Sequence, residues 1–252
     1  MIINNKYKIT DKIAQGSFGS VFKGIHIRTG NKVAIKVESI ERNLKMIKNE
    51  STIYNYLKDL KCVPKLKWFG RDDNNYYMVT DLLGLSLQEI KDKNTVIPIN
   101  TTKKIGVQII QILQSIHARG LIHRDIKPGN ILLKDNVPKI CDFGLSKNSK
   151  LIRNDELVGS HGYIAPEIHN GYSYTSKVDM WALGIIIFQM IGGYHPYSDI
   201  PCKYSANKIN YDNRYWENIS EDGKNFIDNL LVCDPHDRMS ASDALYHKWL
   251  CI

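Results

Sequence analysis

The 252-residue chain has few cysteines and prolines and no long uninterrupted apolar run. Its five cysteines are scattered without a C-x-x-C pair, which argues against a disulfide framework or a zinc site. The longest apolar run, around residues 184–188, ends at Gln189 and is too short to span a bilayer. The first residues also lack the pattern of a signal peptide. We therefore expect an intracellular protein, cytoplasmic or nuclear, that does not enter membranes.

Negative charge is scarce in the first third of the chain. Residues 1–80 contain 15 Lys and Arg against 7 Asp and Glu, a difference of +8, whereas residues 81–252 contain 19 of each. Such an excess indicates either an ordinary solvated surface or attraction to acidic or phosphorylated partners. No aromatic stripe accompanies the lysines, so specific nucleic-acid binding is not expected.

The pattern of residues 1–83 predicts a small antiparallel sheet with one helix. Alternating apolar residues and glycine turns predict three strands over residues 7–37. Helical spacing follows over residues 43–58, and residues 63–66 and 76–80 flank a polar hairpin turn. This part is predicted to form an N-terminal lobe.

Residues 84–252 are predicted to be mainly helical. A long buried helix is expected to end near Gly120, and two short strands are expected on either side of Asp135. Further helical patterns cover residues 178–192, 220–232 and 240–249, the last with a capping box at its start. These residues are predicted to form a larger C-terminal lobe.

The residues between the long helix and the two short strands carry the strongest chemical pattern. They read His123-Arg124-Asp125-Ile126-Lys127-Pro128-Gly129-Asn130. Asp125 can accept a hydroxyl proton, and Lys127 can neutralise charge on a moving phosphoryl group. Asn130 can offer its amide oxygen to a divalent metal. With so many fixed positions, the H-R-D-x-x-x-x-N pattern favours phosphoryl transfer over coincidence.

A second pattern lies between two predicted strands near the N-terminus. Gly16 and Gly19 allow backbone amides to approach phosphate oxygens closely. A glycine-rich hairpin alone is commonly just a turn, but here Lys36 follows within an apolar strand. A lysine in such a strand is costly to bury unpaired. We expect Glu50 on the following helix to be its partner; an exposed Glu50 facing Lys45 or Lys48 is the alternative.

Together these patterns resemble a eukaryotic-type protein kinase domain over residues 7–250. Three more landmarks follow in the family's order: Asp142-Phe143-Gly144, Ala165-Pro166-Glu167 and Asp179-Met180-Trp181. The resemblance implies an α+β, two-lobed fold, ATP as the phosphoryl donor, and Mg²⁺ or Mn²⁺ held by Asn130 and Asp142. It also implies that Asp179 braces the catalytic loop and that Arg238 is the buried partner of Glu167.

The resemblance further assigns a set of nucleotide-binding residues. Ala14 stands where the family has its first glycine, which adds one methyl group to the loop. Thr80 would line the adenine pocket, and the backbone of Asp81 and Leu83 would bond the adenine edge. The full set is Ile13, Ala14, Gly16, Ser17, Gly19, Val21, Ala34, Lys36, Thr80, Asp81, Leu83 and Leu132. For the apolar members, ordinary core packing is an equally valid description.

Lys127 and Ser160 resemble the serine/threonine branch of the family. Residues 37–40, 49–54 and 82–87 resemble casein kinase I, although the intact Ala165-Pro166-Glu167 departs from that group. Gly129 replaces an acidic residue common in kinases that select arginine, so we expect neutral or acidic sites in protein substrates.

In the kinases that this chain resembles, the arginine at the position of Arg124 usually pairs with a phosphate on the activation segment. Here only Ser146 and Ser149 are acceptors within residues 145–158, and Asp155 and Glu156 stand where the main phosphosite would fall. We expect one of these acids to pair with Arg124, assisted by Lys147, and to give activity without phosphorylation. An exposed acidic loop is the alternative.

The sequence favours an active, monomeric serine/threonine kinase over two rivals. A non-catalytic pseudokinase would usually lack an equivalent of Lys36, Asp125 or Asp142, and all three are present. A small-molecule kinase would lack the Ala165-Pro166-Glu167 segment that supports a bound peptide.

Overall fold

The computed structural model describes residues 1–16, 19–42, 46–151, 157–197, 209–211 and 214–250. The chain forms two compact units, one of Met1–Gly84 with Cys141–Gly144, the other of Leu85–Ile140 with Leu145–Ile252. Residues 141–144 pack with the first unit although they lie far along the chain. The boundary after residue 83 stays a prediction.

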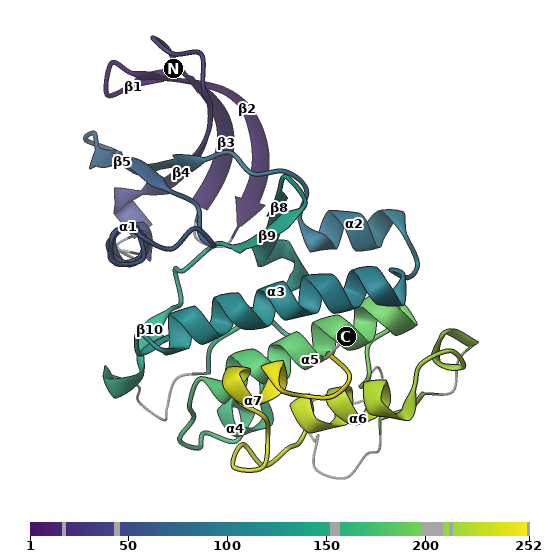
Figure 1. The fold of residues 1–252 in the computed structure, drawn as a ribbon. Coiled ribbons are helices and arrows are strands. Elements are labelled where there is room, and N and C mark those ends of the chain that lie inside the picture. The colour runs from purple at the N-terminus through teal and green to yellow at the C-terminus, as the bar shows by residue number, and fades with distance from the viewer. Residues whose placement is uncertain (17–18, 43–45, 152–156, 198–208, 212–213, 251–252) are drawn as a thin grey trace. The chain divides into compact units, whose positions relative to one another are not determined.

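The first unit is built on a curled antiparallel sheet (Figure 1). Its strands, in spatial order, are β1 (Ile2–Ile3), β2 (Tyr7–Gly16), β3 (Gly19–His26), β4 (Lys32–Ser39), β6 (Asn75–Asp81) and β5 (Leu66–Arg71). After β4 come the 3₁₀ helix η1 (Ile40–Arg42) and helix α1 (Met46–Tyr56). Alternation along β4 buries Val33 and Ile35 against Tyr7 and Tyr77, so one face of the sheet forms the core.

The opposite face of β4 carries the functional residues. Lys36 is opposite Val21 on β3 and Met78 on β6, and Ala34 is opposite Thr80. Because paired residues on neighbouring strands point to the same side of a sheet, these side chains share one face.

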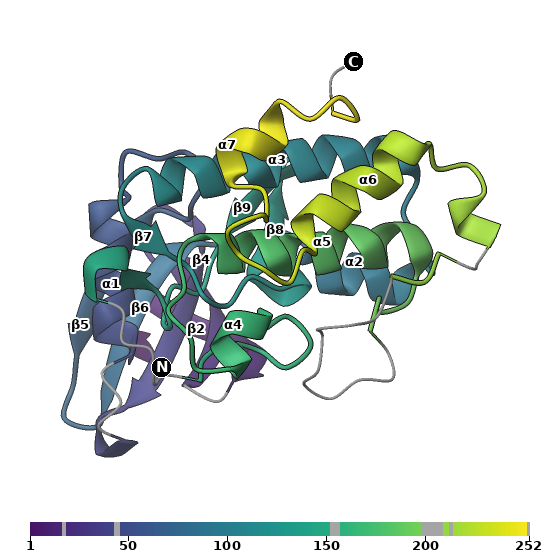
Figure 2. The same ribbon diagram turned by 90° about the horizontal axis from the view of Figure 1, so that it is seen from below.

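The second unit is mainly helical. Its helices are α2 (Leu87–Lys93), α3 (Ile99–His117), α4 (Pro166–His169), α5 (Lys177–Gly192), α6 (Glu221–Leu230) and α7 (Ala241–Leu245). Its strands are β7 (Leu121–Ile122), β8 (Ile131–Lys134), β9 (Val137–Ile140) and β10 (Lys147–Asn148), and its 3₁₀ helices are η2 (Pro128–Asn130), η3 (Ser149–Leu151) and η4 (Arg214–Trp216). Helix α5 is buried along almost its whole length and packs beside α3 and α6 (Figures 1 and 2). It is therefore the core of this unit.

The predicted α+β fold, with a small antiparallel sheet, one main helix and a mainly helical remainder, is confirmed. Several details differ. Strand β5 begins at Leu66 rather than residue 63, because Pro64 has no N–H for the ladder. Helix α7 ends at Leu245 rather than residue 249. The short helix α2, started by a capping box at Ser86, was not predicted. No helix among the described residues is long and apolar enough to cross a membrane.

Candidate functional site

Three ionisable side chains meet in the first unit. Lys36 Nζ on β4 lies 2.7 Å from Glu50 Oε2 on α1 and 2.7 Å from Asp142 Oδ1 in the segment after β9. The side chains of Lys36 and Glu50 are 13% and 2% exposed. The structure thus pairs the strand lysine with Glu50, and the alternative of an exposed Glu50 is wrong.

Burial and charge act in opposite directions on this cluster. Burial alone would lower the pKa of Lys36, but the carboxylates of Glu50 and Asp142 raise it above its ordinary value. Burial raises the pKa of Glu50 to about 7, despite the opposing charge of Lys36, and the nearby Asp142 charge adds to the rise. Lys36 therefore stays charged, whereas Glu50 titrates near neutral pH.

The backbone after Asp142 is tied to the same helix. Phe143 N donates to Glu50 Oε1 at 3.2 Å, and Asp142 N donates to the Tyr54 hydroxyl at 3.2 Å. The rings of Tyr54 and Phe143 pack edge to face at 5.3 Å. Asp142 has a left-handed backbone (φ 63°), which is costly for a residue with a side chain. These contacts on α1 hold Asp142 in that conformation.

The glycine-rich hairpin joins β2 and β3. Ala14 is opposite Val21, and Gly16 is opposite Gly19. At Gly19 (φ 153°) a Cβ would lie 2.2 Å from Val37 O, so only glycine fits. Ile13 is exposed. Ser17, the remaining predicted residue of the loop, lies outside the described residues.

The predicted adenine-binding residues of the first unit continue along β6 and beyond it. Thr80 is buried, and its Oγ1 donates to Asp81 O at 3.3 Å. The Asp81 carboxylate lies 2.8 Å from Lys67 Nζ, and Leu83 is half-buried. The remaining member, Leu132, lies half-buried on β8 in the second unit.

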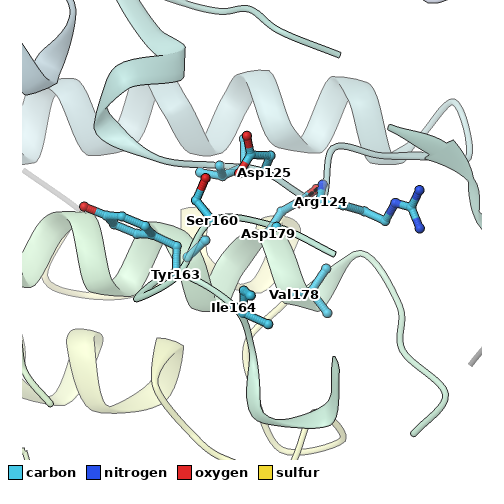
Figure 3. A pocket seen from close by; sticks show the side chains of 10 residues that line it. Arg124, Asp125, Ser160, Tyr163, Ile164, Val178 and Asp179 are labelled. Atoms are coloured by element: carbon cyan, nitrogen blue, oxygen red, sulfur yellow. Dashed lines mark hydrogen bonds between the residues drawn. The ribbon is translucent and has the colours of Figure 1, made fainter. Parts of the chain in front are cut away.

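In the second unit, two side chains of the same loop hold Asp125 in place. Lys127 Nζ lies 2.8 Å from Asp125 Oδ2, and Asn130 Nδ2 donates to the same oxygen at 3.0 Å and to Asp125 O at 2.8 Å. Lys127 also donates to Ser160 Oγ at 2.6 Å. Figure 3 shows Asp125 and Ser160 at a small cavity of about 10 Å³, which has room for a single water molecule. Lys127 thus links the loop of Asp125 to the segment of Ser160.

Asp179 on α5 supports this loop from beneath. Its oxygens accept hydrogen bonds from the backbone N–H groups of His123 at 3.0 Å and Arg124 at 2.9 Å, and His117 Nε2 lies 2.8 Å away. Burial alone would raise the pKa of Asp179, but the contact with His117 and the backbone donors hold it below its ordinary value. The expected bracing contact is present, and it holds Arg124 in a left-handed conformation (φ 68°).

A buried ion pair ties α4 to the C-terminal part of the unit. Arg238 Nη1 and Nη2 donate to the two oxygens of Glu167 at 2.7 and 2.9 Å. Arg238 also donates to the carbonyls of Val232, Lys177 and Cys233. The predicted pairing of Glu167 with Arg238 is present, and the two residues are 2% and 1% exposed.

Sequence reasoning missed two residues that contact the loop. His117 closes α3 and reaches Asp179, and the Tyr174 hydroxyl accepts from Arg124 Nη1 at 2.8 Å. Both lie among other polar residues, so no local sequence pattern sets them apart or identifies a partner.

The expected metal ligands, Asn130 and Asp142, belong to different units. In the part of the chain that the structure describes, no three His, Cys, Asp or Glu side chains are grouped so that they could hold a metal ion. The donor set of one carboxylate and one amide oxygen is nevertheless the kind that Mg²⁺ accepts, with water and phosphate completing its coordination.

Several curated proteins are similar to the chain over nearly its whole length. It is 32% identical over 268 residues to calcium-dependent protein kinase 4 of Plasmodium falciparum, covering 99% of this chain and 50% of that protein. It is 31% identical over 271 residues to serine/threonine-protein kinase RAD53 of Saccharomyces cerevisiae, covering 96% and 32%. With serine/threonine-protein kinase H1 homolog of Pinctada fucata it shares 32% over 266 residues, covering 98% and 62%.

The chain thus spans about half the length of several curated relatives that it matches. The family model described as protein kinase domain matches residues 7–250, which include every landmark discussed above. The chain belongs to the protein kinase domain family.

Proposed function

We propose that the chain is an ATP-dependent serine/threonine protein kinase. The observation that carries this proposal is the state of Asp125. Its side chain is 7% exposed, Lys127 and Asn130 fix its Oδ2 atom, and Oδ1 has no hydrogen-bond partner among the described residues. A fixed carboxylate with one unused oxygen suits a base that orients a substrate hydroxyl and accepts its proton.

The other residues have supporting roles. Lys36, kept charged by Glu50, holds phosphate oxygens together with the glycine-rich loop. Lys127 offsets negative charge near Asp125 as the phosphoryl group moves. ATP supplies that group, and a divalent ion, Mg²⁺ or Mn²⁺, supplies positive charge when bound to Asn130 and Asp142. The protein therefore acts by positioning and electrostatics more than by covalent chemistry.

Radiolabelled ATP with a generic protein substrate tests the proposal. Asp125→Asn should lower the transfer rate by about 10²–10⁴-fold, because the amide cannot accept a proton. Asp222→Asn, a change of the same kind on the surface of α6, should leave the rate unchanged. A wild-type protein without transfer in Mg²⁺ or Mn²⁺ would favour the pseudokinase alternative. Transfer to small molecules but not to proteins would favour a small-molecule kinase.

We also infer that activity does not require phosphorylation of the activation segment. The predicted partners of Arg124, Asp155 and Glu156, lie outside the described residues. Support comes from two other contacts: Arg124 Nε donates to Leu145 O at 2.7 Å, and Nη1 donates to the Tyr174 hydroxyl. These neutral acceptors already orient the guanidinium group without a phosphate.

The two candidate phosphoacceptors differ in their surroundings. Ser146 is 4% exposed and its Oγ donates to His123 O at 3.1 Å, whereas Ser149 is exposed at the start of η3. We therefore expect phosphatase treatment and Ser149→Ala to leave activity intact. Activity lost after both treatments would contradict the inference, and Ser149→Asp activity above that of wild type would do so independently.

For substrates we infer neutral or acidic sites around the acceptor. Gly129 is exposed in η2, and a Cβ there would meet nothing within 4 Å. Gly129→Glu is therefore sterically allowed and adds the acidic contact that this chain lacks. In a peptide-array screen the variant should gain a preference for arginine near the acceptor. A wild-type profile that already favours arginine would contradict the inference.

The same screen tests the likeness to casein kinase I, which we infer from the N-terminal motifs at residues 37–40, 49–54 and 82–87. A profile that matches that of a casein kinase I enzyme supports the likeness, and an unrelated profile contradicts it. We further infer a monomer; light scattering at the mass of a dimer would contradict this.

A further inference from the structure

We propose that Glu38 is a positioning residue that fixes α1 so that Glu50 reaches Lys36. Glu38 lies near the end of β4 and is 1% exposed. Its Oε2 atom accepts a hydrogen bond from Ile47 N at 2.9 Å, and Ile47 is fully buried as the second residue of α1. The proposal deepens the kinase function proposed above and rests on it for its activity measurement.

The chemistry of the contact suits a helix anchor. The first N–H groups of a helix have no partner within the helix, and a carboxylate beside them is favoured by both hydrogen bonding and the helix dipole. Glu38 belongs to another element, so its bond ties the start of α1 to β4. Because Ile47 is buried, water cannot replace this acceptor without opening the contact.

Two contacts join β4 and α1, and the carboxylate comes from the strand in one and from the helix in the other. Lys36 and Glu38 are two residues apart on β4 and therefore point to the same face of the sheet. Ile47 and Glu50 are three residues apart on α1 and therefore share a helix face. The strand offers a carboxylate to the helix backbone at Ile47, and the helix returns a carboxylate to the strand at Lys36.

The Glu38 bond adds a second polar contact with β4, besides the Lys36–Glu50 pair, that fixes the rotation of α1. Glu50 also receives the Phe143 N–H at 3.2 Å, so a rotation would disturb the segment of Asp142 as well. Loss of the Glu38 bond should thus weaken the Lys36–Glu50 pair without removing any atom of that pair.

Hydrogen exchange of residues 46–56 tests the anchor directly and needs no activity. Glu38→Ala should speed exchange in the first turn of α1, and Glu38→Asp should do the same because its side chain is shorter. Glu38→Gln should stay close to wild type, because its amide oxygen can still accept from Ile47 N. Glu41→Gln, an exposed change in η1, is the matched control. Unchanged exchange in Glu38→Ala would overturn the proposal.

A double-mutant cycle separates positioning from general stability. Glu38→Ala should lower kcat/KM by about 10-fold, as for a lost charge-assisted hydrogen bond. In a Glu50→Gln background the same change should lower it by less than about 2-fold, because the pair it positions is already gone. Equal losses in both backgrounds would overturn the proposal.

The two measurements distinguish this proposal from the kinase assignment. If wild-type protein transfers no phosphate but exchange still responds to Glu38→Ala and not to Glu41→Gln, the anchor stands and the proposed activity fails. If wild type is active and neither exchange nor kcat/KM responds to Glu38→Ala, the activity stands and the anchor fails.

Discussion

Glu50 and Asp179 are equally buried carboxylates whose pKa values shift in opposite directions. Each is 1% exposed, Glu50 in the first unit and Asp179 in the second. The pKa of Glu50 rises to about 7, whereas that of Asp179 falls below its ordinary value. Burial alone raises the pKa of both groups, so the partners must explain why the two differ.

The difference lies in the partners. Glu50 depends on Lys36, which it shares with a second carboxylate, Asp142, so the two negative charges compete for one cation. Asp179 accepts from two backbone N–H groups and lies beside His117. At Asp179 the contact with His117 and the backbone donors outweigh burial, whereas at Glu50 burial outweighs the charge of Lys36 and Asp142 adds a second negative charge.

This contrast matches a division of work. The Lys36 cluster can change its charge within the physiological range, while the loop around Asp125 rests on a carboxylate that cannot. Activity that depends on the Lys36 cluster should therefore change with pH, whereas removing Asp179 should destabilise the second unit.

The largest expected effect tests the second region. Asp179→Ala leaves the backbone N–H groups of His123 and Arg124 without their acceptor, and His123 is fully buried. The free energy of unfolding should fall by about 3–5 kcal/mol. Urea denaturation at neutral pH measures it.

Asp222→Ala serves as the control, because its ion pair with Lys248 is exposed and should contribute less than about 1 kcal/mol. If both variants lost the same amount, the view that Asp179 is held by its backbone partners would be wrong.

The next effect belongs to the first region and concerns pH. As pH falls through about 7, Glu50 takes up a proton and its ion pair with Lys36 is lost, so kcat/KM should decline on the acid side. Glu50→Gln has no proton to gain, so that decline should disappear. Its activity should also be lower than wild type throughout, by about 10-fold. Initial rates across the pH range measure both.

Glu41→Gln should keep the wild-type pH profile, because Glu41 is exposed and solvent screens its charge. An acid decline that persists in Glu50→Gln would assign the titration to another group and remove the contrast.

The sequence indicated some of these features and not others, for physical reasons. A lysine inside an apolar strand requires a carboxylate, so the Lys36–Glu50 pair could be predicted from residue chemistry and order. The sheet and long helices followed from periodicity. By contrast, the contact between His117 and Asp179 joins two helices through residues that are 62 positions apart in the sequence. No local pattern specifies such a pair.

Local conformation was equally hard to predict. Arg124 and Asp142 adopt left-handed backbones, which are uncommon for residues other than glycine, because tertiary contacts impose them. The acceptor role of Glu38 depends on where α1 begins, and sequence patterns define helix ends poorly. The roles of the individual site residues stay predictions that the experiments above address.

The smallest effect refines the comparison by weakening Asp179 instead of removing it. His117→Leu deletes one partner and should lower the free energy of unfolding by about 1 kcal/mol. Because the pKa of Asp179 lies below its unfolded value, its stabilisation is present above that ordinary value and is lost as pH falls through the folded value. Losing His117 raises the folded pKa, so acid unfolding of the variant should begin at a higher pH. His236→Leu, an exposed change, should not move the acid transition, and an unshifted transition in His117→Leu would mean that the backbone donors alone keep Asp179 ionised.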